Sequence, residues 1–110
     1  MVSLPDIQRL ADQIAQLYKP ERIVLFGSHA HGTPHEYSDV DLLIVMPYEG
    51  DTLDFRMKMW AEIRPSFSVD FIVRRPDDTA RRYAQFDPLI REALDKGKVL
   101  YERDRARVAG

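Results

Sequence analysis

The first candidate for chemistry is a pair of aspartates, Asp39 and Asp41, at the start of the second apolar run of the chain, Val40–Val45. In a strand, side chains at positions i and i+2 point to the same face, so the two carboxylates emerge together while Val40 points into the core. Two like charges this close repel each other unless a cation or an arginine lies between them. Because a chain with 12 aspartates is expected to contain such a pair by chance, its meaning depends on its context.

A third carboxylate, Asp70, lies inside a later apolar run. If the two runs form adjacent strands, Asp70 joins Asp39 and Asp41 in one cluster. Converging carboxylates suit Mg²⁺, and two such ions would hold the attacking and leaving oxygens of a phosphoryl transfer. Asp70 would also be placed to accept a proton from an attacking hydroxyl. The alternative is a structural aspartate that caps a turn or pairs with an arginine such as Arg74. We favour the metal, since unpaired buried carboxylates are costly.

A glycine-serine pair, Gly27-Ser28, directly follows the first apolar run, Arg22–Phe26. Glycine lets the backbone approach a ligand closely, and Ser28 can donate a hydrogen bond to a phosphate oxygen and also cap a following helix. The exposed amides at the start of such a helix bind anions. Taken alone, the pair is more simply an ordinary turn between a strand and a helix, so its value depends on the aspartates that follow.

Two further groups of side chains admit both a functional and a structural interpretation. Three histidines could bind a transition metal, but no cysteine accompanies them, so we favour polar loop residues near a phosphate site. An arginine cluster could contact triphosphate or a partner, but we favour a solvated face with ion pairs to Asp77 and Asp78. The histidines are His29, His31 and His35, and the arginines are Arg74, Arg75, Arg81 and Arg82.

The elements that position these residues indicate one α/β domain with a small mixed β-sheet flanked by helices. The first two strands lack strict alternation of apolar and polar residues, so both of their faces are expected to be covered. We take residues 1–102 as the domain and residues 103–110 as a charged, frayed tail. The predicted helices span 3–18, 51–63, 77–83 and 87–96, and the predicted strands span 22–26, 40–45, 68–73 and, at an edge, 98–101.

Two of these helices carry signals at their ends and along one face. Ser3 with Asp6 resembles a capping box at the first helix, and Asp51 is the expected N-cap of the second long helix. Each helix has apolar residues at spacings of three and four, which predicts an amphipathic helix. Trp60 and the pair Met57 and Met59 are interpreted as core or as partner surface, between which the sequence does not decide. The first set is Leu4, Ile7, Leu10, Ile14 and Leu17, and the second is Leu53, Met57 and Trp60.

The bulk composition excludes several classes of protein. The 110 residues suffice for one domain, and the absence of cysteine excludes a disulfide scaffold and a thiolate zinc site. The net charge of −2 is not that of a general nucleic-acid binder. With no signal-peptide pattern and no apolar stretch near the ~20 residues that a membrane span needs, we expect a cytoplasmic protein without membrane contact.

Taken together, Gly27-Ser28, ten intervening residues, Asp39-Val40-Asp41 and Asp70 match in order and spacing the signature of the polymerase-β superfamily. The chain resembles a minimal nucleotidyltransferase domain of that superfamily over nearly its whole length, residues 21–102. The resemblance implies a nucleotidyltransferase fold and Mg²⁺-dependent transfer of a nucleotide from a triphosphate such as ATP to a hydroxyl. It implies catalytic and metal-binding roles for Asp39, Asp41 and Asp70, and nucleotide-binding roles for Gly27, Ser28, Asp39 and Asp41.

The same resemblance implies a partner. Many stand-alone domains of this kind are antitoxins that transfer AMP to a tyrosine of a helical HEPN-domain ribonuclease toxin. The turn in these antitoxins usually carries an arginine where this chain has His31. Two alternatives stand beside this one: an antitoxin that occludes its toxin without catalysis, and a nucleotidyltransferase for a small molecule, for which the chain offers little beyond the minimal core.

Overall fold

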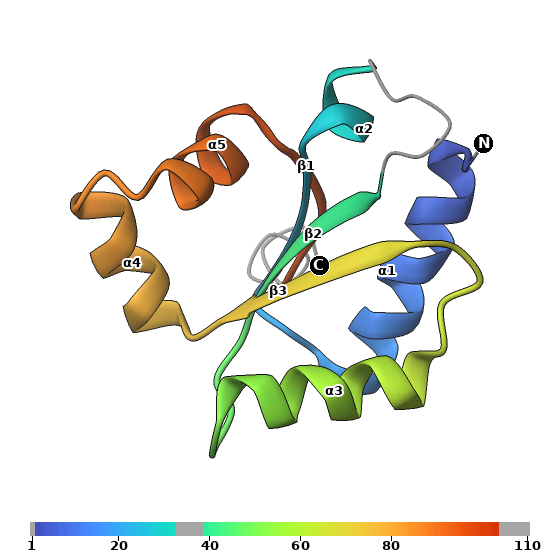
Figure 1. Cartoon of the computed structure of the whole chain (residues 1–110), viewed down its shortest axis with the longest axis horizontal. Coiled ribbons are helices and arrows are strands. Elements are labelled where there is room, and N and C mark those ends of the chain that lie inside the picture. The colour runs from blue at the N-terminus through green and yellow to red at the C-terminus, as the bar shows by residue number, and fades with distance from the viewer. Residues whose placement is uncertain (1, 33–38, 104–110) are drawn as a thin grey trace.

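The computed structural model describes residues 2–32 and 39–103 (Figure 1). Each predicted helix and strand is present, with ends within one residue of the predicted bounds, and a four-residue helix follows Gly27. The elements are α1 (Leu4–Tyr18), β1 (Arg22–Phe26), α2 (Ser28–His31), β2 (Val40–Val45), α3 (Thr52–Ile63), β3 (Val69–Arg74), α4 (Pro76–Ala84), α5 (Pro88–Lys96) and β4 (Lys98–Glu102).

The four strands form one mixed sheet in the order β3-β2-β1-β4. β1 pairs antiparallel with both β2 and β4, whereas β2 and β3 run parallel and are joined through α3. The predicted mixed sheet is therefore confirmed, and β4 lies at an edge as expected. The second edge strand is β3, the strand that carries Asp70.

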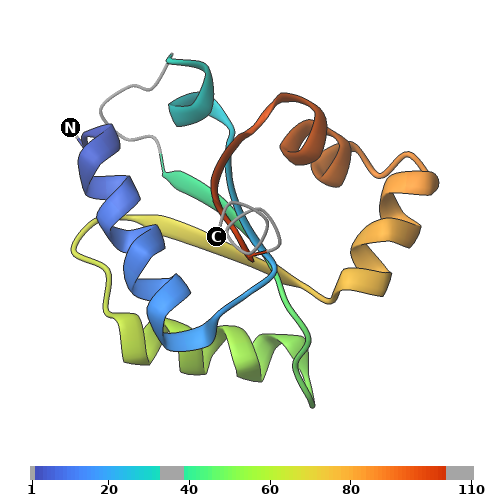
Figure 2. The same ribbon diagram turned by 180° about the vertical axis from the view of Figure 1, so that it is seen from behind.

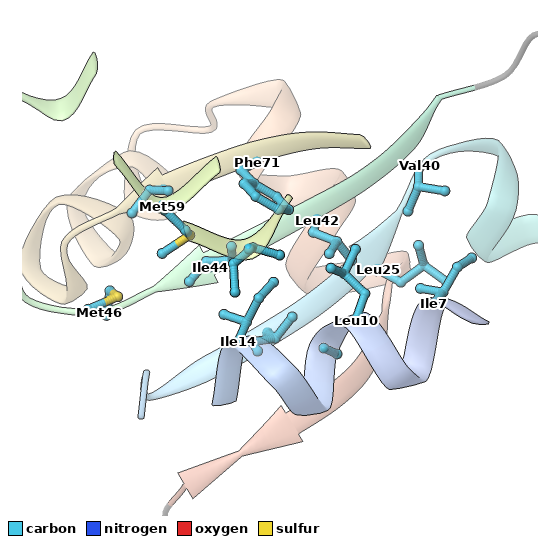
Figure 3. Close-up of a cluster of buried hydrophobic side chains, with 14 of the residues drawn as sticks. Ile7, Leu10, Ile14, Leu25, Val40, Leu42, Ile44, Met46, Met59 and Phe71 are labelled. Atoms are coloured by element: carbon cyan, nitrogen blue, oxygen red, sulfur yellow. The ribbon is translucent and has the colours of Figure 1, made fainter. Parts of the chain in front are cut away.

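Helices cover both faces of the sheet, as the strand sequences predict. Figures 1 and 2 show α1 and α3 on one side and α4 and α5 on the other. Figure 3 shows the core beneath α1 and α3, in which Leu42 and Ile44 of β2 meet Ile14 and Met59. The opposite face is covered mainly by α5; its buried residues are Val24, Phe26, Leu43, Val45, Ile72, Ile90 and Ala93.

The first helix begins at the predicted capping box. Ser3 accepts a hydrogen bond from the backbone N–H of Asp6, and the Asp6 carboxylate accepts one from the backbone of Ser3, which satisfies two amides at the helix start. The predicted apolar face is buried at its centre, in Ile7, Leu10 and Ile14. At the two ends of this face, Leu4 and Leu17 are exposed.

The helix α3 presents apolar residues on two sides. Asp51 caps it as predicted by accepting from the N–H of Asp54, and Met59 and Ile63 face the core. The stripe predicted from the sequence points away from that core. Its members are all exposed, namely Leu53 (57%), Met57 (62%) and Trp60 (49%).

The hairpin of α4 and α5 is fixed by ion pairs. Asp78 forms ion pairs with both Arg81 and Arg82, whereas the sequence predicted pairs to Asp77 as well. Arg82 also pairs with Asp87, the N-cap of α5. The other two arginines of the predicted cluster have no ion pair with any of the described residues. Arg74 donates to the carbonyl of Val73, and Arg75 stacks on Tyr48 and donates to the carbonyls of Tyr48 and Gly50.

The C-terminal end of the described part is held by a hydrogen bond to the residue before β1. Arg103, the first residue of the predicted tail, donates from its backbone N–H to the carbonyl of Glu21, and residues 104–110 lie outside the described residues. Among the helices of residues 2–32 and 39–103, none is both long enough and apolar enough to span a membrane.

Candidate active site

The parallel pairing of β2 and β3 brings two of the predicted carboxylates together. Asp41 and Asp70 are direct register partners, so both side chains leave the same face of the sheet on neighbouring strands. Asp39 immediately precedes β2, two residues before Asp41. The condition on which the predicted cluster depended, that the two apolar runs form adjacent strands, is confirmed.

Asp41 lies among several other negatively charged side chains. Its side chain is half-buried, and burial raises the pKa of its carboxyl above the ordinary value. The negative charges of Asp70, Asp39 and Glu92 raise this pKa further, while His29 opposes them. A carboxylate surrounded in this way is stabilised by any cation placed among its neighbours.

Asp39 is exposed and is positioned by Ser68, the residue directly before β3. The Ser68 hydroxyl donates to Asp39 Oδ1 over 2.5 Å, and the backbone N–H of Val40 donates to the Ser68 carbonyl over 3.0 Å. Ser68 thus fixes the start of β2 against the start of β3. The sequence analysis did not single out Ser68, because no local pattern marks a residue whose role is to join two strands.

Asp70 has an arginine partner, although a different one from that considered above. Arg56 of α3 forms a hydrogen-bonded ion pair with Asp70 Oδ1, and both side chains are close to half exposed. Arg74 does not take this role. The structure therefore shows the pairing with an arginine that the structural alternative expected, with Arg56 in place of Arg74.

Gly27 lies in the turn between β1 and α2, directly beside Asp41. Its backbone angles, φ 79° and ψ −159°, lie in a region that is almost reserved for glycine. A Cβ at this position would collide with Asp41 Oδ2. Gly27, rather than Ser28, is the N-cap of α2, and no side chain caps that helix, so the predicted capping role of Ser28 is wrong.

The helix α5 contributes a fourth carboxylate that the sequence analysis missed. Glu92 affects the pKa of Asp41 and lies 3.9 Å, through its Oε1, from the Nε2 of His31. His29 is buried and His31 is exposed, whereas His35 lies outside the described residues. Only the packing of α5 against β1 places Glu92 here, and no motif in the sequence marks it.

The donor set fits a hard divalent cation in chemistry. Asp39, Asp41 and Asp70 offer only carboxylate oxygens, which suit Mg²⁺ rather than a softer metal, and the crowding of negative charge around Asp41 is of the kind that a cation relieves. Within residues 2–32 and 39–103, however, no three acidic or histidine side chains converge closely enough to hold a metal ion as they lie.

Comparison with known proteins identifies the family. A family model described as "Nucleotidyltransferase domain" matches residues 7–100, which is most of the chain. The chain belongs to this nucleotidyltransferase domain family. The fold class predicted from the sequence, a small mixed sheet flanked by helices of the nucleotidyltransferase type, is confirmed.

One curated relative of this nucleotidyltransferase domain is a Methanocaldococcus jannaschii protein that carries the name "putative protein adenylyltransferase". The two are 35% identical over 88 residues, a match that covers 74% of this chain and 58% of the relative. The chain therefore spans little more than half of the length of that relative.

Solved structures share the fold at low sequence identity. A "putative nucleotidyltransferase" from Sulfolobus solfataricus is 22% identical with a TM-score of 0.63, over 93% of this chain and 82% of that chain. A chain from a toxin–antitoxin structure with AMP-PNP is 20% identical with a TM-score of 0.59, over 93% of this chain and 78% of that chain. A chain from the toxin–antitoxin structure MntA-HepT is 16% identical with a TM-score of 0.54, over 97% and 79%. At these identities the likeness shows the fold alone.

Proposed function

We propose that this nucleotidyltransferase domain transfers AMP from ATP to a hydroxyl of a partner protein in a Mg²⁺-dependent reaction. The observation that carries the proposal is the parallel register of Asp41 with Asp70, with Asp39 beside them and Gly27 packed against Asp41. Those features join the two halves of the sequence signature at one end of the sheet. The name of the curated relative supports adenylyl transfer to protein.

In the proposed reaction, the acceptor oxygen attacks the α-phosphorus of ATP. The new bond joins that oxygen to the phosphorus, and the bond from the α-phosphorus to the oxygen bridging it to the β-phosphorus breaks, so that pyrophosphate leaves with the bonding electrons. The hydroxyl proton passes to Asp70, a carboxylate on the edge strand β3. AMP ends as a phosphodiester on the acceptor, and no oxidant or reductant is consumed.

The chain's own residues divide the work between metal and phosphate. Mg²⁺ held by oxygens of Asp39, Asp41 and Asp70 would neutralise phosphate charge as it develops during transfer. Ser28 donates to a phosphate oxygen, and Gly27 lets the phosphates approach β2, since it has no side chain between the turn and Asp41.

We further propose that the partner is a HEPN-domain toxin, with a tyrosine as the acceptor. A protein partner is supported by the exposed stripe of Leu53, Met57 and Trp60 along α3, since apolar side chains gathered on one exposed helix face are typical of interaction surfaces. The likeness in fold to chains of toxin–antitoxin pairs supports the same class of partner.

The test is co-expression of this chain with its cognate HEPN protein, followed by the intact mass of that protein. The proposal expects a mass increase of one or more AMP units on a tyrosine, and none when Asp41→Asn replaces the parent chain. A toxin that is bound tightly but unmodified would instead support inhibition by occlusion, the alternative that is favoured by the engagement of Asp70 with Arg56. A third outcome, AMP on a small molecule and none on protein, would contradict the proposed acceptor class.

A further inference from the structure

Arg56 belongs to a helix on the face of the sheet opposite to the candidate active site. It belongs to α3, which packs with α1 over the face formed by Leu42, Ile44 and Phe71. Asp70 leaves the opposite face, together with its register partner Asp41. Figure 1 shows β3 at the edge of the sheet, beside α3. Because no strand lies beyond β3, the side chain of Arg56 can reach Asp70 around that edge.

This geometry draws the Asp70 carboxylate outward. Asp41 lies on β2, the inner neighbour of β3, whereas Arg56 approaches from the open side of β3. The carboxylate neighbour of Asp70 and its ion-pair partner therefore lie in opposite directions. The side chain of Asp70 is 43% exposed in this arrangement. The finding that no three acidic or histidine side chains of residues 2–32 and 39–103 converge to hold a metal agrees with a third carboxylate turned away from the other two.

We propose that Arg56 is a positioning residue that competes with the divalent cation for Asp70. With Arg56 bound, Asp70 is held at the sheet edge, and a cation must displace the guanidinium to recruit this carboxylate. Arg56 thereby sets the cation concentration at which the active site assembles. The proposal rests on the proposed function only in that Asp70 is taken as a ligand of the cation.

The direction in which cation affinity changes when Arg56 is removed distinguishes a competing arginine from an orienting one. Donors that hydrogen-bond a metal-binding carboxylate usually orient it, and their loss then weakens metal binding by about 10- to 100-fold. A competing donor has the opposite effect, since its removal frees the carboxylate. Because an exposed ion pair contributes little, we expect a gain in cation affinity of about two- to fivefold when Arg56 is removed.

The experiment measures Mn²⁺ binding to the full chain by electron paramagnetic resonance, without nucleotide, so that catalysis does not enter the result. Arg56→Gln is compared with the parent chain and with Arg9→Gln. The control removes the same charge from an exposed ion pair, Arg9 with Asp6, on α1. Arg56→Lys, which keeps the charge but not the forked donor, should fall between parent and Arg56→Gln, and circular dichroism confirms the fold of each variant.

Binding that tightens in Arg56→Gln, but not in Arg9→Gln, supports the proposal. The gain must also vanish in Arg56→Gln combined with Asp70→Asn. Unchanged, weaker or undetectable Mn²⁺ binding in Arg56→Gln overturns it. If Asp70→Asn alone leaves the parental affinity unchanged, the metal assignment itself fails. If Asp70→Asn weakens binding while Arg56→Gln does not tighten it, only the competition fails.

Discussion

The two faces of the sheet differ in how far their helices extend along the strands. Under α1 and α3 the core continues to the start of β2, where Val40 is fully buried. On the other face, α5 covers Leu43 and Ile72, and the residues two positions earlier on the same strands are the half-buried Asp41 and Asp70. The core under α1 and α3 therefore supports the sheet along the whole of β2. On the second face, α5 covers a shorter part of the strands, which leaves Asp41 and Asp70 accessible at their starts.

Neighbouring leucines on β2 allow the sharpest test of this difference, because Leu42 and Leu43 are both fully buried on opposite faces. We expect Leu42→Ala to lower the free energy of unfolding by about 3–5 kcal/mol, and Leu43→Ala by about 2–4 kcal/mol. Because Leu43 shares a face with Asp41, its truncation should also raise the KM for ATP. Urea denaturation and steady-state kinetics measure the two effects. A KM change in Leu42→Ala but not in Leu43→Ala would reverse the assignment of the faces.

A smaller effect is expected at the turn that separates the first two strands. Gly27→Ala combines an unfavourable backbone conformation with a Cβ that collides with Asp41, and should cost about 2–3 kcal/mol of stability. Gly32→Ala is the matched control, since Gly32 also has a positive φ, of 71°, but a Cβ there would meet no atom of the described residues within 4 Å. This control variant should cost about 1 kcal/mol.

The two glycine variants should differ more in activity than in stability. Displacement of Asp41 in Gly27→Ala is expected to lower kcat by about a hundredfold, as misplaced catalytic groups commonly do, whereas Gly32→Ala should stay near the parental rate. Equal kcat values in the two variants would show that the contact of Gly27 with Asp41 has no part in transfer.

The smallest expected effect lies at the far end of the second face, where Asp87 caps α5. Hydrogen bonds from the backbone of Ile90 and from Arg82 and Leu89 hold the pKa of Asp87 below its usual range. Its carboxylate therefore adds stability at neutral pH that is lost as the pH falls through this lowered pKa. Asp87→Ala should lower the free energy of unfolding by about 1 kcal/mol at pH 7 and by a smaller amount in acid. Asp87→Asn, which can still cap the helix, should lower it by less than Asp87→Ala does at neutral pH. Thermal unfolding across pH checks this, and a cost that grows in acid would contradict it.

The sequence predicted the helices and strands because they depend on short-range pattern, and it predicted that Asp70 would lie on the strand beside Asp41. Alternation within a strand fixed the common face of Asp39 and Asp41, and one assumption about adjacent strands added Asp70. What the sequence could not supply is contact between elements far apart in the chain. Arg56 meets Asp70 only because α3 borders an open edge, and Glu92 nears Asp41 only because α5 packs on β1.

Helix patterns were informative about amphipathicity but not about which face is buried. On α3, the stripe of Leu53, Met57 and Trp60 has the spacing of a core face, yet Met59 and Ile63 are the residues that reach the sheet. A helix with apolar residues on two sides gives two candidate faces, and only the path of the chain selects between them. The exposed stripe is consequently a candidate surface for a partner.

The most direct test of nucleotidyl transfer at this carboxylate cluster uses ATP labelled at either the α- or the γ-phosphate, with the cognate HEPN protein as acceptor. The account predicts that label from the α-phosphate enters the acceptor and label from the γ-phosphate leaves with pyrophosphate. Asp41→Asn should abolish transfer without loss of stability, since burial and neighbouring carboxylates already oppose the charge of Asp41. Transfer of the γ-label, or transfer of the α-label by Asp41→Asn at the parental rate, would contradict the account.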